Sequence, residues 1–199
     1  MGDQGRRPTC FAWATTAAHE HRRNEELSVE YLHWACGPPA AARGTRPAMT
    51  RALKSPGQPP ESQWPYDPDR DESASTYTPP SSVVGPFQTA TTRSATPSID
   101  LVRDALLAGD IPIAGIRVTP AFHRATDGVI DGIEQGTDGH AICLVGVVEA
   151  TRPVGSISSG GRLVCVRNSW GPDWGASGHA LMTERAFLAT SLFVLVLND

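Results

Sequence analysis

The chain has 199 residues and a formal net charge of −4, and 40% of its residues are hydrophobic. This length and composition predict one folded domain of two lobes, and the weak negative charge disfavours nucleic acid or an anionic membrane as the main partner. No apolar run approaches the roughly 20 residues of a membrane-spanning helix. We therefore expect a protein that binds neither nucleic acid nor membrane.

The N-terminal part of the chain is predicted to be helical. An alanine-rich stretch at 10–22 has strong helix propensity, and further helices are expected at 28–36, with Ser28 as N-cap, and at 48–54. Cys10 would begin the first helix. The dipole and the N–H groups at a helix N-terminus stabilise a thiolate, so Cys10 is expected to be a reactive nucleophile.

The C-terminal part is predicted to consist mostly of strands. A stretch rich in serine, threonine and proline, from Asp67 to Pro86, is expected to connect the two parts, and a helix follows at Ser98–Leu107. Apolar runs then predict strands at 111–118, 140–148, 163–167, 178–182 and 192–197. The expected division is a helical lobe at about 1–82 and a β lobe at about 83–199.

Two polar residues stand at the ends of predicted strands. His140 begins the apolar run Ala-Ile-Cys-Leu-Val, and Asn168 follows Leu-Val-Cys-Val-Arg. A thiol, an imidazole and an amide together suit acyl transfer, in which a third group orients the base that activates the nucleophile. Each alone would more often be structural, since most cysteines outside disulfides are buried small hydrophobes. The pattern becomes specific through the order of four residues: Gln4, Cys10, His140 and Asn168.

These motifs, from Gln-x5-Cys through Gly-His-Ala to Asn-Ser-Trp-Gly-x-x-Trp-Gly, resemble those of the papain-like cysteine peptidases. The resemblance covers nearly the whole chain and points to the bacterial and archaeal branch of the family. It implies an α+β, papain-like fold with an N-terminal helical lobe and a C-terminal antiparallel, β-barrel-like lobe. The active-site cleft would lie between the lobes. The implied activity is that of an endopeptidase, which hydrolyses a polypeptide substrate through a thioester on Cys10.

The resemblance also implies a role for each catalytic residue. His140 would act as base and acid, while Asn168 would accept the ring N–H of His140 and fix its tautomer. Trp170 would cover that hydrogen bond and exclude water. Gln4 would donate its side-chain N–H to the oxyanion of the tetrahedral intermediate, together with the backbone N–H of Cys10.

Residues that contact the substrate are also expected by resemblance. Ala141 and Ile116 would line the pocket for a substrate side chain, and their small apolar walls favour an aliphatic or aromatic one. Gly44 would replace the Gly-Gly edge of the cleft that pairs with the substrate backbone. Trp170 would complete this set.

The chain departs from many secreted relatives at Arg7, where they carry a second cysteine in a disulfide. Cys143 and Cys165 lie in apolar strand patterns and are expected to be buried thiols, whereas Cys36 ends a helix and has no partner at the position expected for the family. Few or no disulfides favour a reducing, cytoplasmic setting. The many prolines, together with the alanine and arginine content, favour a bacterial source.

Other functions stay open at this point. An amine or another thiol could capture the thioester instead of water, which would make the protein an acyltransferase, ligase or deamidase. The chain could also be a binding or regulatory domain with an idle site. Nine residues precede Cys10, fewer than in the family, so we expect control by a regulatory partner or a neighbouring domain. No cofactor is expected, and no metal either, because His19 and His21 would point to different sides of a helix.

Overall fold

The computed structural model describes residues 2–37, 44–73, 75–125, 128–134, 136 and 138–198. The chain divides into two compact units. The helical unit consists of Gln4–Arg93 with Leu197–Asp199, and the sheet unit consists of Met1–Asp3 with Ser94–Val196. Each unit contains its own cluster of buried hydrophobic side chains.

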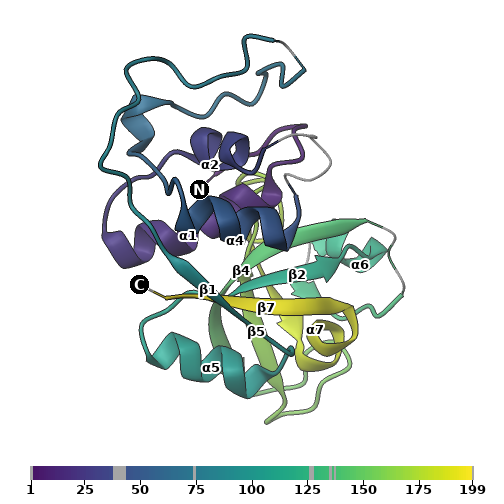
Figure 1. Ribbon diagram of the computed structural model, residues 1–199. Coiled ribbons are helices and arrows are strands. Elements are labelled where there is room, and N and C mark those ends of the chain that lie inside the picture. Colours follow the sequence, from purple (N-terminus) through teal and green to yellow (C-terminus); the bar gives the residue numbers. More distant parts are fainter. Residues whose placement is uncertain are drawn as a thin grey trace. The chain divides into compact units, whose positions relative to one another are not determined.

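The helical unit carries the elements of the N-terminal part of the chain (Figure 1). The three predicted helices are confirmed, together with one short 3-10 helix. Ser28 is the N-cap of its helix, and its Oγ accepts a hydrogen bond from the backbone N–H of Tyr31 at 3.0 Å. The third helix begins two residues earlier than expected, since Pro47 is tolerated in a first turn. The elements are α1 (Cys10–Arg23), α2 (Val29–Ala35), α4 (Arg46–Lys54) and η1 (Glu61–Gln63).

A seven-stranded sheet with the order β1-β7-β2-β4-β5-β6-β3 forms most of the sheet unit. Neighbours among β2, β4, β5, β6 and β7 pair antiparallel, as predicted, but β3 runs parallel to β6. Over the described residues the sheet is therefore mixed and open, with β1 and β3 as its edges, and it is not closed into a barrel. The strands are β1 (Thr91–Ala95), β2 (Ile113–Arg117), β3 (Val129–Ile130), β4 (Gly139–Glu149), β5 (Arg162–Arg167), β6 (His179–Thr183) and β7 (Ser191–Asn198).

Besides η1, four elements of the described residues lie outside the sequence prediction. The β1 sequence, Thr-Thr-Arg-Ser-Ala, lacks the apolar alternation that marks a half-buried strand. The two unpredicted helices each begin at a threonine cap. Thr119 Oγ1 accepts from the Phe122 N–H, and Thr183 Oγ1 accepts from the Ala186 N–H, both at 3.1 Å. The four elements are β1, β3, α6 (Pro120–His123) and α7 (Glu184–Thr190).

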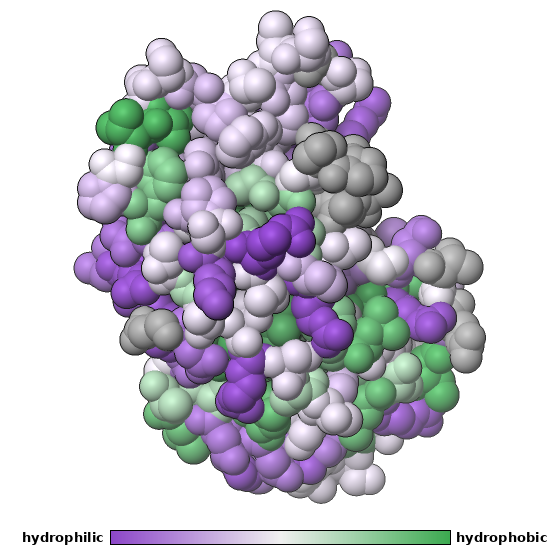
Figure 2. All heavy atoms as spheres, viewed as in Figure 1, coloured by the Kyte–Doolittle hydropathy of each residue, from purple (hydrophilic) through white to green (hydrophobic). Residues whose placement is uncertain are grey.

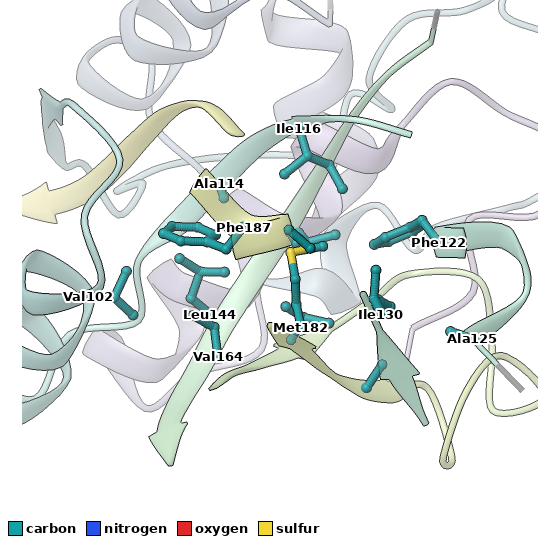
Figure 3. Close-up of a cluster of buried hydrophobic side chains, with 14 of the residues drawn as sticks. Val102, Ala114, Ile116, Phe122, Ala125, Ile130, Leu144, Val164, Met182 and Phe187 are labelled. Carbon is teal, nitrogen blue, oxygen red and sulfur yellow. The ribbon is translucent and has the colours of Figure 1, made fainter. Parts of the chain in front are cut away.

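The sheet unit is built around one large apolar cluster, part of which Figure 3 shows. The predicted helix α5 (Ile99–Leu107) packs against β4, and α7 packs against β5 and β6. Phe122 and Phe187 are its bulkiest fully buried side chains, and truncating such a residue to alanine typically costs about 3–5 kcal/mol. Strands and helices all contribute to the side chains labelled in Figure 3: Val102, Ala114, Ile116, Phe122, Ala125, Ile130, Leu144, Val164, Met182 and Phe187.

Exposed large apolar side chains are spread along the chain. On the face shown in Figure 2, apolar groups are separated by polar residues, which is normal for a protein surface. Among the helices in the described ranges, none combines the length and the apolar character needed to cross a lipid bilayer. The exposed residues include Val84, Leu107, Ile133, Val148, Leu188 and Leu192.

Candidate active site

Cys10 is the first residue of α1, as the sequence predicts, and its side chain is partly exposed. Thr9 occupies the N-cap position, but its hydroxyl does not cap the helix. It hydrogen-bonds instead to the Tyr66 hydroxyl at 2.8 Å. The positive end of the α1 dipole therefore lies at Cys10, where it favours the thiolate over the thiol.

Gln4 is buried in the helical unit, and its amide is oriented by a neighbouring backbone group. Gln4 Nε2 donates to the carbonyl oxygen of Arg7 at 2.9 Å. The Gln4 carbonyl in turn accepts a hydrogen bond from the Tyr66 hydroxyl at 2.8 Å. Since Tyr66 uses its only O–H hydrogen there, the Thr9 hydroxyl must donate to Tyr66. One tyrosine thus links the backbone at Gln4 to the residue before Cys10.

The sheet unit brings His140 and Asn168 together. His140 lies near the start of β4 and Asn168 directly follows β5, and the antiparallel pairing of these strands places their two ends side by side. His140 Nε2 and Asn168 Oδ1 are 2.6 Å apart. Asn168 Oδ1 also accepts the Ser169 N–H at 2.8 Å, which fixes the orientation of the amide. Because a carbonyl oxygen only accepts, Nε2 carries the proton and the neutral ring presents Nδ1 as a base.

Aromatic side chains surround this histidine. The Trp170 ring lies 4.8 Å from the His140 ring, centroid to centroid, at an angle of 39°. Phe122 meets Trp170 edge-on at 5.3 Å and also contacts His140 at 5.7 Å. His123 stacks on Trp170 at 5.2 Å, and the Trp174 indole donates to the Phe122 carbonyl at 3.1 Å. The imidazole is thus held by packing as well as by its hydrogen bond.

Burial controls the charge of His140. Only 7% of the surface of His140 is exposed, and the loss of solvation on burial lowers the pKa of His140 to about 4. The hydrogen bond to Asn168 acts in the opposite direction, while the charge of His123 lowers the pKa further. Within the sheet unit, His140 is therefore a neutral base near pH 7.

The residues expected to contact substrate lie in different environments. Ile116 has 0% exposure and belongs to the apolar core of the sheet unit, and Ala141 is 4% exposed. Ile116 lies in β2, which is buried along most of its length. Gly44 is exposed, with no atom near the position of a Cβ, and Trp170 is partly exposed. The substrate roles of Ala141, Ile116, Gly44 and Trp170 stay predictions.

Several neighbours of these residues were not assigned a role from the sequence. Phe122 and His123 pack around Trp170, and Tyr66 and Arg7 orient Gln4. Only Arg7 could have been noticed from the sequence, because it is a charged residue three positions before the proposed nucleophile. Nothing in the sequence singled out the aromatic residues, because a phenylalanine or tyrosine more often serves packing alone.

The other cysteines and histidines differ in how far they are buried. All four cysteines are thiols, with Cys36 and Cys143 buried. The expectation of a buried thiol is wrong for Cys165, which is partly exposed. His19 is buried and contacts Gln58 through Nδ1 at 3.0 Å, whereas His21 is exposed. Within the described part of the chain, no group of three histidine, cysteine, aspartate or glutamate side chains is arranged to hold a metal ion.

The family model for papain family cysteine proteases matches residues 1–190. The chain belongs to this family. A search of curated proteins found no match. Papain-family proteases are hydrolases, and the predicted motifs around Cys10, His140 and Asn168 all lie inside the matched range.

Solved structures with the same fold come from plants and bacteria. Xylellain, a cysteine protease from Xylella fastidiosa, has a TM-score of 0.70 and 18% identity, with 100% of this chain and 82% of that chain covered. The clostridial protease Cwp84 after propeptide cleavage has a TM-score of 0.77 and 16% identity, with 100% and 54% covered. The ragweed pollen allergen Amb a 11 in its proform has a TM-score of 0.69 and 18% identity, with 98% and 60% covered. The papain-family chain thus spans little more than half of the length of two of these proteins.

Proposed function

We propose that this papain-family protein is an endopeptidase that hydrolyses peptide bonds through a thioester on Cys10. The observation that carries the proposal is the 2.6 Å hydrogen bond between His140 and Asn168, which leaves His140 Nδ1 as the basic atom of a buried, neutral ring. The position of Cys10 at the N-terminus of α1 supports the proposal from the other unit. An isolated antiparallel β-bridge pairs Asp3, the residue before Gln4, with Trp170, and this pairing supports the proposal further.

The reaction has two halves in this mechanism. His140 Nδ1 takes the proton of the Cys10 thiol, and the resulting thiolate attacks the carbonyl carbon of the substrate. The oxyanion that forms is stabilised by the Gln4 amide and the backbone N–H of Cys10. The C–N bond then breaks, the amine leaves with the proton carried by His140, and a thioester remains. In the second half, His140 takes a proton from water, and the hydroxide attacks the thioester. The new carboxylic acid departs, and Cys10 is restored.

Asn168 and Trp170 serve this mechanism through His140. The Asn168 carbonyl keeps the proton on Nε2, so that Nδ1 is available for proton transfer in both halves. The Trp170 ring excludes water from one side of the imidazole, which strengthens its hydrogen bond to Asn168. Both residues would therefore affect the rate of turnover more than the binding of substrate.

The test compares two cysteines of the same protein. Cys10→Ala is expected to abolish peptide hydrolysis while the far-ultraviolet circular dichroism stays unchanged. Cys165→Ala is the matched control, because burial raises the pKa of that thiol and it should not react. Full activity should remain in the control. Peptide hydrolysis that persists in Cys10→Ala would contradict the proposal.

The same preparation separates hydrolysis from the alternatives. In ¹⁸O-water, a peptidase places one ¹⁸O atom in the new carboxylate, which mass spectrometry detects. An acyltransferase or ligase instead yields the amide or thioester of an added amine or thiol. Iodoacetamide labelling of Cys10 without turnover of any peptide tested would favour an idle, binding domain.

A further inference from the structure

A buried ion cluster lies three residues before Cys10. The Arg7 side chain is 7% exposed, and its partner Glu30 is 0% exposed. The two form a bidentate pair, with Nη1 and Nη2 each 2.7 Å from a carboxylate oxygen. Arg7 Nε donates to Glu72 at 2.8 Å, and Nη1 also donates to the Asp67 carbonyl at 2.6 Å. Every nitrogen of this guanidinium is therefore engaged within the helical unit.

Further residues complete the cluster. The Tyr77 hydroxyl donates to Glu30 at 2.8 Å, and His33 Nε2 lies 2.8 Å from Glu72. Burial would raise the pKa of Glu72, but the hydrogen bonds and charges of His33 and Arg7 outweigh it and lower that pKa to about 2. Glu30 and His33 belong to α2, whereas Glu72 and Tyr77 belong to the segment after η1. The cluster thus joins the N-terminal segment to two other parts of the helical unit.

The backbone of Arg7 faces the proposed catalytic residues. Its carbonyl oxygen accepts both the Gln4 side-chain N–H at 2.9 Å and the Thr9 backbone N–H at 2.8 Å. The Arg7 guanidinium also lies over the Tyr66 ring, 4.9 Å from its centroid. Tyr66 is the residue that bonds both Gln4 and Thr9. A shift of Arg7 would therefore move the Gln4 amide and the start of α1 together.

We propose that Arg7 is a positioning residue, whose buried ion cluster holds the Gln4 amide and the N-terminus of α1 in the geometry that stabilises the oxyanion. This inference rests on the proposed peptidase function. A positive charge alone would not hold residue 7 in this orientation, because only a planar guanidinium can bind Glu30 through two parallel hydrogen bonds while donating to Glu72. Replacing a buried ion pair by uncharged residues often leaves stability unchanged, so orientation is the property that the cluster supplies.

The main test is Arg7→Lys in the full chain, which keeps the charge and removes the fork. The expected result is a kcat lower by about 10²-fold, as for loss of one oxyanion donor, with KM changed by less than about threefold. Arg162→Lys is the matched control, because Arg162 also binds a glutamate, Glu184, through two nitrogens, but in the sheet unit. Its kcat and KM should equal those of the wild type.

A double-mutant cycle with Gln4→Ala shows whether Arg7 acts through Gln4. If it does, adding Arg7→Lys to Gln4→Ala lowers kcat by less than about threefold, although Arg7→Lys alone lowers it about 10²-fold. Fully additive losses, or a wild-type kcat in Arg7→Lys, would overturn the inference. The failure of the proposed function is a separate result, since it would appear as turnover that survives Cys10→Ala.

A second variant covers the case in which Arg7→Lys does not fold. Arg7→Met combined with Glu30→Gln removes one charge of each sign and keeps an acceptor for Tyr77. A folded double variant with low kcat, and little further loss on adding Gln4→Ala, supports positioning. A folded double variant with wild-type kcat contradicts it. If neither variant folds, the cluster is required for the fold itself, which also contradicts a role confined to positioning.

Discussion

The two units hold their proposed catalytic residues by different physical means. In the sheet unit, His140 stands on a strand paired with β2 and is packed by Trp170 and Phe122. In the helical unit, Gln4 precedes the first helix and donates to the carbonyl of Arg7. The Arg7 side chain is held by the buried Glu30 and the partly buried Glu72. Apolar packing depends little on pH, whereas an ion cluster depends on the ionisation of its members. The two sets of proposed catalytic residues should therefore fail under different changes.

The largest expected effect comes from the residue held by packing. His140→Ala should lower kcat by at least about 10³-fold, because it removes the group that both takes and gives the proton. Steady-state kinetics with a fluorogenic peptide would measure this, and circular dichroism would check the fold. A loss of tenfold or less in a folded variant would mean that another base serves Cys10.

A smaller effect is expected one contact away from the imidazole. Asn168→Ala should lower kcat by about 10–100-fold, because the ring keeps its packing and loses only the acceptor that fixes its tautomer. Nδ1 and Nε2 then share the proton, which two-dimensional NMR of the imidazole nitrogens would show. If Asn168→Ala proved worse than His140→Ala, the two roles would be misassigned.

Glu72→Gln, a change at one carboxylate of the ion cluster, should show its clearest effect in the stability at acid pH. The pKa of Glu72 is lowered from 4.5 to about 2, so its contribution to stability is present above pH 4.5 and is lost as the pH falls toward 2. Glu72→Gln should therefore flatten this part of the curve of unfolding free energy against pH, by less than the roughly 3 kcal/mol of the full shift, because solvent screens this partly exposed carboxylate. Urea titrations from pH 2 to 7 would measure it, and superimposable curves would refute it.

His140 gives the sheet unit a different window in the same titration. Burial lowers the pKa of His140 from 6.5 to about 4, so the unfolded chain takes up a proton first as the pH falls. Stability linked to His140 is thus present above pH 6.5 and is lost as the pH falls toward 4. Glu72→Gln should leave this window unchanged, which makes it an internal control for the comparison.

Elements with strong local patterns could be predicted from the sequence. The alanine-rich α1 and the long apolar β4 follow from propensity and from runs of buried residues. Whether a β2 side chain belongs to the core or lines a pocket could not be predicted in the same way. Since β2 is buried along most of its length, no alternation distinguishes Ile116 as a core residue from Ile116 as a pocket wall.

The sequence was enough to predict the proposed catalytic residues, but not the residues that hold them in place. The order of Gln4, Cys10, His140 and Asn168 is visible in the sequence, whereas the partners of Arg7 are spread from Glu30 to Tyr77. Charged side chains are usually exposed, so sequence reasoning has no ground for burying an arginine among carboxylates 23 and 65 residues away. Such a cluster emerges only when the tertiary fold brings its members together.

The hairpin formed by β4 and β5 also offers a place for engineering. His140 and Asn168 lie at one end of it, and the turn at residues 151–161 lies at the other, roughly 30 Å away along an eleven-residue strand. Ser156 anchors this turn by donating two hydrogen bonds to Asp131, and Ser159 bonds back to Thr151. A reporter domain inserted between Thr151 and Val154 would keep the Asp131 anchor, so the protease could be made visible without a tag near Cys10.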